Sequence, residues 1–285
     1  MDPLQILSSL GGVARSAALL DAGLSRTDLD FLARHVARPK RGVYAAEDCR
    51  RDYLAAIMHN AVVTCASAAR DYGLWLRTPP PQYHLGCDHG HSTNLWAAVA
   101  GVSSKVHRGL RYPKHHSLPL AALEDVLLHA LRCLPREAAV PLVASAVRLH
   151  GIRTAFFEED LAAQKCGPAL QALRAVDPRV ESLPEAEALL LLIPLARELG
   201  LEVEPQAYVP GIGRVDFLIG GFLIVEIDGV SYHSDRSSVR KDRQRNNSAV
   251  LGGYITLRYV PETIWNEPDR FVTDVRAALT GRLTR

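Results

Sequence analysis

The sequence predicts a multi-domain α/β protein of the α+β type, in which the C-terminal part is a mixed sheet flanked by helices. Two observations predict this class. From Ser182 to Leu279 the residue patterns follow the order helix, hairpin, helix, strand, helix. Residues 13–44 have the pattern of two short amphipathic helices, followed by a basic turn into a strand. With 285 residues, of which 48% are hydrophobic, the chain can form two or three domains with well-formed cores.

The first 48 residues predict a winged helix-turn-helix. Helices are expected over Val13–Asp21 and Ser25–Val36, with Ser25 as N-cap, and Arg38–Tyr44 forms a basic turn. Ser25–Arg34 would be the recognition helix, with a base contact from Arg26. Phosphate contacts are expected from Arg34, Arg38, Lys40 and Arg41. The alternative is a three-helix domain that contacts another protein.

Residues 49–180 are expected to form a connector domain of mixed helix and strand. A helix is predicted over Cys49–Gly73, the prolines at 79–81 break the chain, and a strand begins at Tyr83. Two further helices are predicted over Leu118–Leu134 and Arg136–Leu149. Lys105–Lys114 is rich in basic residues and could follow a phosphate backbone, although such a segment is often a solvated loop.

Four metal-ligand residue types lie close together in this connector. They are His84, Cys87, His89 and His91. Zinc sites usually combine two ligand pairs at characteristic spacings, and no second pair follows here. The sequence therefore does not favour a zinc site at these residues.

The most informative segment is residues 213–233, where three carboxylates stand in apolar strand sequence before a histidine. Arg214–Ile219 and Phe222–Asp228 predict a hairpin around Gly220 and Gly221. A two-residue loop would place Asp216 and Glu226 on opposite faces, whereas an odd-length loop centred on Gly221 would set them directly opposite each other. We favour the odd-length loop, because only this register forms a common site.

These carboxylates predict a divalent-cation site. Buried unpaired carboxylates are unfavourable, and hard oxygen ligands suit Mg²⁺ or Mn²⁺. Alternation places Asp228 on the same face as Glu226. The alternative is a salt-bridged surface hairpin. For His233, which follows the strand, the alternative is a capping or packing role.

Two helices are expected beside the hairpin. Ser182 and Glu185 form a capping-box pattern that opens a leucine-rich helix. Ser237–Leu251 has helical spacing that directs Asp242 and Asn246 toward the sheet. The basic residues Arg240, Lys241, Arg243 and Arg245 spread over the rest of this helix and are candidate DNA contacts.

The order of features in this part of the chain resembles that of the Vsr-like endonucleases of the PD-(D/E)xK superfamily. The features are the helix, the Asp, the Glu-x-Asp-Gly with its following His, the basic helix, and the Gly-Tyr strand with its Arg. This resemblance covers about residues 182–279 and implies a restriction-endonuclease-like fold for a domain over residues 181–285. It implies Asp216 and Glu226 as metal ligands, Asp228 and His233 beside them, and Glu185 and Asp242 as further catalytic residues. In this chain Asp228 stands at the superfamily's lysine position, so His233 is the natural substitute for that lysine.

The N-terminal segment, with its Arg-Gly-Val-Tyr ending at Tyr44, resembles the winged-helix domain of AbiE-type (type IV toxin–antitoxin) antitoxins. Two functions therefore follow as expectations. The first is a divalent-metal-dependent DNA endonuclease targeted by its N-terminal domain. The alternative is an antitoxin-like transcriptional regulator whose nuclease fold binds DNA or a cognate toxin or other protein partner with little or no cleavage.

Composition agrees with a cytoplasmic protein that interacts with DNA and not with a membrane. The formal net charge is only +2, so a DNA-binding surface must be local. Five scattered cysteines suit free thiols in a reducing compartment. The longest apolar run is too short to span a bilayer, and the first residues lack the basic segment of a secretory signal.

Overall fold

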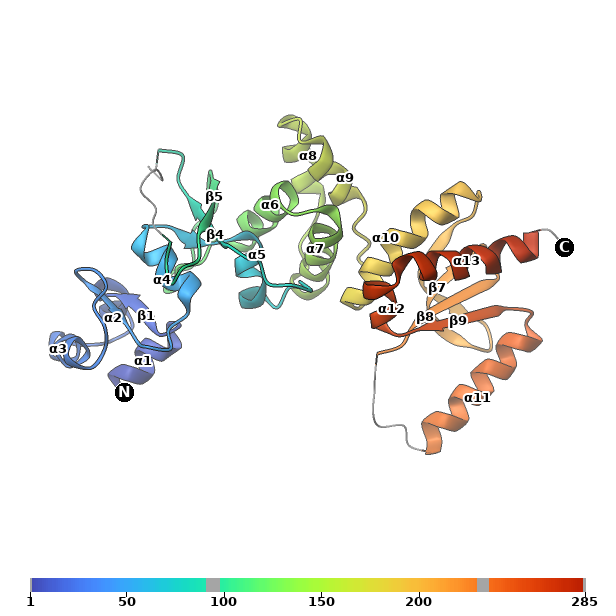
Figure 1. The fold of residues 1–285 in the computed structure, drawn as a ribbon, viewed down its shortest axis with the longest axis horizontal. Helices are drawn as coiled ribbons and strands as arrows, with labels where there is room; N and C mark the ends of the chain where they lie inside the picture. Colours follow the sequence, from blue (N-terminus) through green and yellow to red (C-terminus); the bar gives the residue numbers. More distant parts are fainter. Residues whose placement is uncertain (1, 91–97, 230–235, 284–285) are drawn as a thin grey trace. The chain divides into compact units, whose positions relative to one another are not determined.

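A computed structural model describes residues 2–90, 98–229 and 236–283, with the side chains of all but 236–242 and 283. The described part is a mixed α/β protein with three separate sheets (Figure 1). The chain divides into two compact units. The N-terminal unit comprises residues 1–142 and 155–170, and the C-terminal unit comprises 143–154 and 171–285. Among the described residues, no helix is long and apolar enough to cross a membrane.

The N-terminal unit begins with three short helices and a two-stranded ribbon. In chain order these are α1 (Pro3–Ser9), β1 (Val13–Arg15), α2 (Ser16–Asp21), α3 (Arg26–His35) and β2 (Val43–Ala45). Ser25 caps α3 in a capping box with Asp28, as its position before the apolar run predicts. The core of this part includes Leu7, Leu19, Leu32 and Tyr44.

The sequence misplaced one boundary here. Val13–Arg15, predicted as the first turn of a helix, is strand β1 and pairs antiparallel with β2, Val13 opposite Ala45. The helix starts only at Ser16. Because a strand partner far along the chain supplies hydrogen bonds to this segment, tertiary pairing outweighs the local helical pattern. Helix α1 was not predicted.

A second, three-stranded sheet follows in the same unit. Its strands and the helices that precede, connect or follow them are α4 (Arg51–Met58), β3 (Val62–Val63), α5 (Cys65–Ala68), the 3₁₀ turn η1 (Ala69–Tyr72), β4 (Tyr83–Cys87), β5 (Ser104–Arg108) and α6 (Leu123–Cys133). Strand β3 pairs antiparallel with β4, and β4 pairs parallel with β5. The single helix predicted over Cys49–Gly73 is therefore wrong, because it is interrupted by β3. The chain continues through α7 (Arg136–His150), α8 (Ala155–Ala163) and α9 (Gly167–Arg174).

The C-terminal unit contains a four-stranded sheet in the order β6-β7-β8-β9. Its elements are α10 (Leu183–Glu198), β6 (Val203–Val209), β7 (Gly213–Ile219), β8 (Leu223–Ile227), α11 (Arg236–Leu251), β9 (Ile255–Tyr259), α12 (Pro261–Asn266) and α13 (Pro268–Leu283). The first three strands are antiparallel, and α11 connects β8 to its parallel neighbour β9. The predicted element order is confirmed, and β6 is added at the edge.

Helices pack on this sheet in two groups. Helices α10, α12 and α13 contact one another, and the ring of Phe271 in α13 meets that of Tyr259 in β9 edge-on at 4.8 Å between centroids (Figure 1). Helix α11 contributes Ala249 to a separate cluster with Val215 and Ile224. The carboxylate-bearing hairpin β7–β8 is thus the centre of this unit.

We predict that Phe271→Ala destabilises the C-terminal unit by about 3–5 kcal/mol, because a fully buried aromatic ring is lost and leaves a cavity. Hydrogen exchange of the β7–β9 amides, measured with urea unfolding, reports this loss. Leu251→Ala, at a side chain that is 88% exposed, is the matched control and should change stability by less than about 0.5 kcal/mol. Equal effects of the two substitutions would contradict the assigned core.

Candidate functional site

The β7–β8 hairpin sets the geometry of the candidate site. Phe217 pairs with Val225 and Ile219 with Leu223, which leaves residues 220–222 as the loop. Continued by one residue, this register sets Asp216 opposite Glu226. The odd-length loop centred on Gly221 is confirmed. Both glycines of the loop have positive φ, 58° and 74°, a conformation that side chains disfavour.

Asp216 is held in place by two donors. The backbone N–H of Ile227 donates to its Oδ2 at 2.7 Å, and the amide of Gln206 donates weakly to its Oδ1 at 3.4 Å. Burial raises the pKa of Asp216 to about 6. The N–H of Ile227 opposes this increase, while the negative charges of Glu185, Glu226 and Asp228 add to it. Three neighbouring carboxylates therefore act on the pKa of Asp216.

Glu185 reaches this group from the start of α10. Ser182 caps the helix as the sequence predicts, and its hydroxyl donates to Glu185 Oε1 at 2.7 Å. The other carboxylate oxygen accepts from the N–H of Glu181 at 2.9 Å and from Gln206 Nε2 at 2.8 Å. Gln206, which the sequence analysis did not identify, thus connects Glu185 to Asp216. Its φ of 53° is unusual for a residue with a side chain and marks a local distortion of β6.

Glu226 is 8% exposed and lies between two guanidinium groups. Arg245 of α11 donates to its Oε1 at 2.8 Å, and Arg258 of β9 lies 3.2 Å from its Oε2. Arg258 is opposite Glu226 in the parallel β8–β9 register and also donates to Asn246 at 3.1 Å. Arg245, predicted as a DNA contact, instead points toward the sheet, where it also donates to the carbonyl of Arg214.

These carboxylates are of the ligand type that a hard divalent cation uses, although among the described residues no three of them bring their oxygens close enough together to hold one ion. Carboxylate oxygens are the ligands that Mg²⁺ and Mn²⁺ prefer, and a cation beside Asp216 would offset the burial and, to a smaller extent, the neighbouring negative charges that raise its pKa. Asp228, at the exposed end of β8, donates its own backbone N–H to the carbonyl of Tyr259. Two positive groups, Arg245 and Arg258, lie at the same place, where both pair with Glu226.

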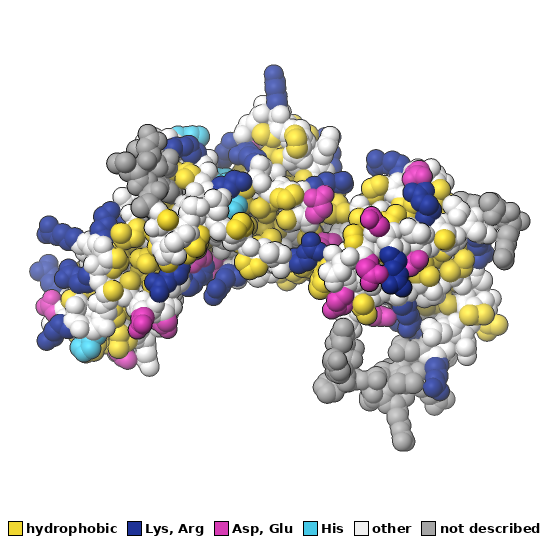
Figure 2. All heavy atoms as spheres, in the orientation of Figure 1, with side chains coloured by type: hydrophobic (Ala, Val, Ile, Leu, Met, Phe, Trp, Pro, Cys, Tyr) yellow, Lys and Arg dark blue, Asp and Glu magenta, His cyan; other side chains and the backbone are white. Residues whose placement is uncertain are grey.

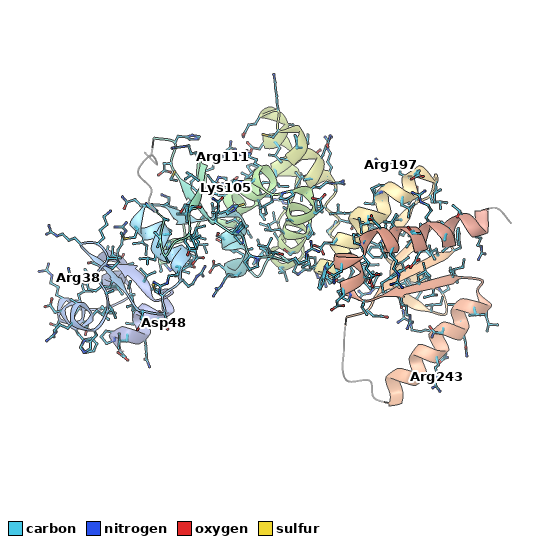
Figure 3. All side chains as sticks on the ribbon, viewed as in Figure 1. Arg38, Asp48, Lys105, Arg111, Arg197 and Arg243 are labelled. Carbon is cyan, nitrogen blue, oxygen red and sulfur yellow. The ribbon has the colours of Figure 1, made fainter. Side chains whose placement is uncertain are left out.

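The remaining predicted residues of this unit are only partly described. His233, and the side chains of Arg240, Lys241 and Asp242, lie outside the described residues. Arg243 is exposed on α11 (Figure 3). The site assembled from described side chains therefore consists of Glu185, Gln206, Asp216, Glu226, Asp228, Arg245 and Arg258.

The predicted phosphate and base contacts belong to the N-terminal unit. All five are exposed, on α3 or in the turn that follows it: Arg26, Arg34, Arg38, Lys40 and Arg41. Figure 2 shows basic side chains gathered over this part of the chain, and Figure 3 labels Arg38. The guanidinium of Arg38 lies over the ring of Tyr44, at 5.6 Å from its centroid.

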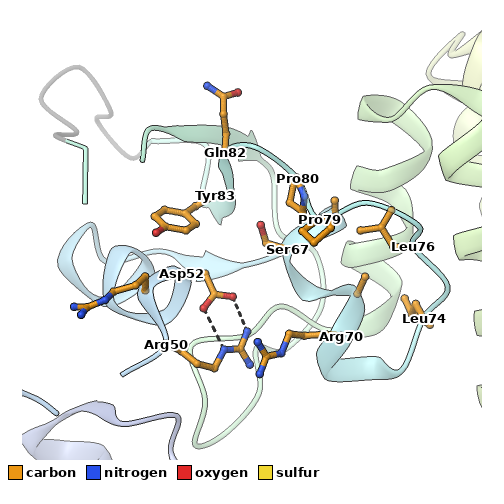
Figure 4. Close-up of a pocket in the computed structure, with 13 residues that line it drawn as sticks. Arg50, Asp52, Ser67, Arg70, Leu74, Leu76, Pro79, Pro80, Gln82 and Tyr83 are labelled. Carbon is orange, nitrogen blue, oxygen red and sulfur yellow. Dashed lines mark hydrogen bonds and ion pairs between the residues drawn. The ribbon is translucent and has the colours of Figure 1, made fainter. Parts of the chain in front are cut away.

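The connector holds a cavity of about 370 Å³ whose lining includes Arg50, Asp52, Arg70 and Tyr83 (Figure 4). Arg50 has a structural role here, because it forms ion pairs within the protein. Its guanidinium pairs with Asp52 at 2.6 Å and with Asp71. This cavity contains none of the predicted site residues.

The basic segment Lys105–Lys114 is largely engaged within its own unit. Arg111 pairs with Asp160 of α8, and Lys114 lies 3.5 Å from Asp88. The backbone N–H of Arg111 also donates to Asp125 of α6 at 3.1 Å. These partners favour a structural role for Arg111 and Lys114 over a phosphate-tracking one.

Of the clustered residues considered for zinc that the structure describes, only His84 joins a group of ligand atoms. Cys87 lies an odd number of positions further along β4, and so on its other face. The ring of His89 is closest to Gly109, and His91 lies outside the described residues. His84 instead lies beside His107 and Cys133, which the sequence analysis did not connect with it.

Comparison with known proteins does not assign this arrangement. The chain matches no protein-family profile, and no curated protein matches it significantly.

We predict that Asp216→Asn removes a pH dependence of stability. A carboxyl whose pKa is raised from 3.8 to about 6 stabilises the fold below about pH 4, and this contribution is lost as the pH rises through about 6. We compare the unfolding free energy of the variant with that of the native chain, in EDTA. The difference, variant minus native, should be about 1–3 kcal/mol larger at pH 7.5 than at pH 4. The amide oxygen that this substitution introduces can still accept from the N–H of Ile227.

Urea unfolding of both proteins at the two pH values measures this difference. Asp21→Asn, at an exposed residue that ends α2, is the control and should leave the pH dependence unchanged. A native chain and an Asp216→Asn variant with parallel pH profiles would show that Asp216 titrates normally.

Proposed function

We propose that the C-terminal unit is a divalent-metal-dependent DNA endonuclease of restriction-endonuclease-like fold, targeted by an N-terminal winged helix-turn-helix. The single observation that carries this proposal is the hairpin register, which sets Asp216 opposite Glu226. The electrostatic influence of Glu185 and Asp228 on Asp216 supports a shared site. Asp216 has no cationic partner among the described side chains, and a divalent cation placed there would supply the chemistry of phosphodiester hydrolysis.

In this proposal Asp216 and Glu226 hold Mg²⁺ or Mn²⁺, with Glu185 and Asp228 beside them. The ion supplies Lewis-acid polarisation of the phosphate and a more acidic bound water. Gln206 orients Glu185 and Asp216 through its hydrogen bonds. His233 is proposed to accept a proton from the attacking water.

The absent superfamily lysine has a candidate replacement. Arg258 lies opposite Glu226 in β9, at the position from which a cation can approach the carboxylates and a phosphate together. A guanidinium binds phosphate oxygens through two parallel hydrogen bonds, although it does not act as a base. We therefore assign phosphate binding to Arg258 and proton transfer to His233.

The N-terminal elements support the targeting role. Helices α2 and α3 lie between the two strands of the β1–β2 ribbon in the chain, and α3 begins with exposed Arg26. Arg34, Arg38, Lys40 and Arg41 continue the basic surface into the turn before β2. Recognition helices place their first residues against base edges, while basic residues of the wing contact phosphates.

One observation favours the alternative, an antitoxin-like DNA-binding regulator with an inactive nuclease fold and a toxin or other protein partner. Glu226 already has two guanidinium partners, Arg245 and Arg258, which balance its charge without a metal. Under this reading the carboxylates are structural. Both functions require DNA binding, and only the first requires cleavage.

We expect Asp216→Ala and Glu226→Ala each to abolish cleavage of plasmid, linear or mismatched DNA by the full chain in Mg²⁺ or Mn²⁺, because the cation loses a ligand. EDTA should do the same to the native chain. His233→Ala should slow cleavage by about 10²–10⁴-fold. Glu204→Ala, at an exposed acid of β6, is the matched control and should cleave normally. Equal cleavage by the native chain and the Asp216/Glu226 double variant would reject the nuclease.

We expect charge reversal of Arg38 and Arg41 to weaken DNA binding by the full chain on all sequences, because phosphate contacts are lost. The slope of log affinity against log salt should fall by about 1 for each lost contact. Arg26→Ala should instead change sequence preference. Arg136→Glu with Arg197→Glu, two exposed arginines elsewhere, gives the same charge change and should have a smaller effect.

Fluorescence anisotropy over a salt series, in EDTA, measures the DNA affinity and its dependence on salt. Loss of binding by the control pair alone would move the DNA surface away from α3. Tight binding with no cleavage in either metal would favour the regulator.

A further inference from the structure

Four metal-ligand side chains converge inside the N-terminal unit and share no residue with the carboxylate site or the predicted DNA contacts. They are Cys65, His84, His107 and Cys133, and their ligand atoms all lie within 4.8 Å of one another. Each comes from a different element. Cys65 begins α5 directly after β3, His84 lies in β4, His107 lies in β5, and Cys133 ends α6.

Strand register explains how the two histidines meet. In the parallel pair β4–β5, His107 is opposite Gly86, so it shares a face with His84 two residues earlier. A side chain at position 86 would meet Leu110 and Thr64 at 3.0–3.3 Å, so glycine here keeps this face clear beside the histidines. The two rings stack with centroids 5.2 Å apart.

Two separations between these ligand atoms are close to those of a tetrahedral zinc site, and all lie within 4.8 Å. Zinc–nitrogen bonds of about 2.05 Å and zinc–sulfur bonds of about 2.3 Å place neighbouring ligands about 3.3 Å (N to N) and about 3.6 Å (N to S) apart. His107 Nε2 lies 3.1 Å from His84 Nδ1. Cys133 Sγ lies 3.7 Å from the same His84 Nδ1.

Burial and charge also fit a closed site. Cys65, His84 and His107 are buried, at 0%, 5% and 9% exposure, and Cys133 is half-buried. Two thiolates and two neutral imidazoles around Zn²⁺ give a centre with no net charge. Such a centre tolerates burial, whereas an unbalanced ion would not.

The surroundings hold the ligands in position. Cys65 has a φ of 51°, a left-handed conformation that a residue with a side chain rarely adopts unless its environment imposes it. Thr64, the preceding residue, shares a 2.9 Å hydrogen bond with His129 of α6. The ring of His129 in turn stacks on His107, 4.9 Å between centroids. The cluster is thus supported by a layer of contacts outside it.

We propose that Cys65, His84, His107 and Cys133 bind one structural Zn²⁺ through two thiolates, His84 Nδ1 and His107 Nε2. Mixed sulfur and imidazole ligands in a tetrahedral arrangement are typical of zinc, and four protein ligands leave no position for substrate. The ion would tie the central strand β4 and the edge strand β5 to α5 and α6. This small sheet, with a two-residue strand at its edge, has few interactions of its own to hold it.

The competing structure for the same side chains is a disulfide between Cys65 and Cys133, which would leave both histidines without a metal. The two possibilities differ in metal content and in mass. A disulfide removes two hydrogens and binds no zinc, whereas the zinc site keeps both cysteines as thiolates that react with a thiol reagent only after the metal is removed.

The test is the metal content of the full chain, purified under reducing conditions without added chelator and measured by inductively coupled plasma mass spectrometry. We expect about one zinc per chain. Cys133→Ser and His107→Gln should each lose most of it. Cys166→Ser and His116→Gln, at a cysteine and a histidine outside the cluster, are the matched controls and should keep it. Asp216→Ala should also keep it, which separates this site from the carboxylate site.

Removing zinc with a strong chelator should lower the thermal midpoint of the full chain by at least about 5 °C, and adding zinc back should restore it. Cobalt substitution should give the absorption of a tetrahedral thiolate complex in the native chain and in the two controls. A native chain without zinc, or one whose mass shows a Cys65–Cys133 disulfide, overturns the proposal. So does full zinc retention by Cys133→Ser and His107→Gln. The zinc content of the native chain tests the proposal by itself, so a variant that fails to fold does not leave the proposal undecided.

Discussion

The register of the β7–β8 hairpin is the constraint on which the candidate site depends. A loop of residues 220–222 sets Asp216 opposite Glu226, and a loop one residue shorter would send them to opposite faces of the sheet. Side-chain direction alternates at every residue of a strand, so the conformation of two glycines controls whether carboxylates 10 positions apart can act together. The hydrogen bond from Ile227 to Asp216 then holds the pair in this arrangement.

The second constraint is how the negative charges of these neighbouring carboxylates are balanced. Glu226 is neutralised by Arg245 and Arg258, while Asp216 receives only an N–H and an amide and has a raised pKa. The site is therefore asymmetric, with one carboxylate satisfied and one that benefits from a cation. In the N-terminal unit, the proposed site would balance its ion differently, because two thiolates carry the charge that neutralises Zn²⁺ and two imidazoles complete the ligand set. The two clusters differ in ligand chemistry, so their expected metals differ.

Sequence reasoning predicted the parts of this fold that depend on neighbours along the chain. Ser25 and Ser182 cap helices as expected, because a cap needs only the next three residues. The hairpin and the helix–strand order of the C-terminal unit followed from alternation and glycine positions. Prediction failed where a distant partner decides. Val13–Arg15 became a strand because β2 pairs with it, and the expected helix over residues 49–73 is divided because β3 pairs with β4.

The sequence by itself determined the mixed α/β class, the order of the C-terminal elements, and Asp216 and Glu226 as carboxylates of one hairpin, while two loop lengths stayed open until the register was known. Only the tertiary structure decided that Arg258 neutralises Glu226, that Gln206 joins Glu185 to Asp216, and that Arg245 turns inward. It alone brought together Cys65, His84, His107 and Cys133, which are separated by 19, 23 and 26 positions. The physical reason is that strand period and turn length act over a few residues. Parallel pairing and helix–sheet contact instead join residues whose spacing along the chain carries no signal.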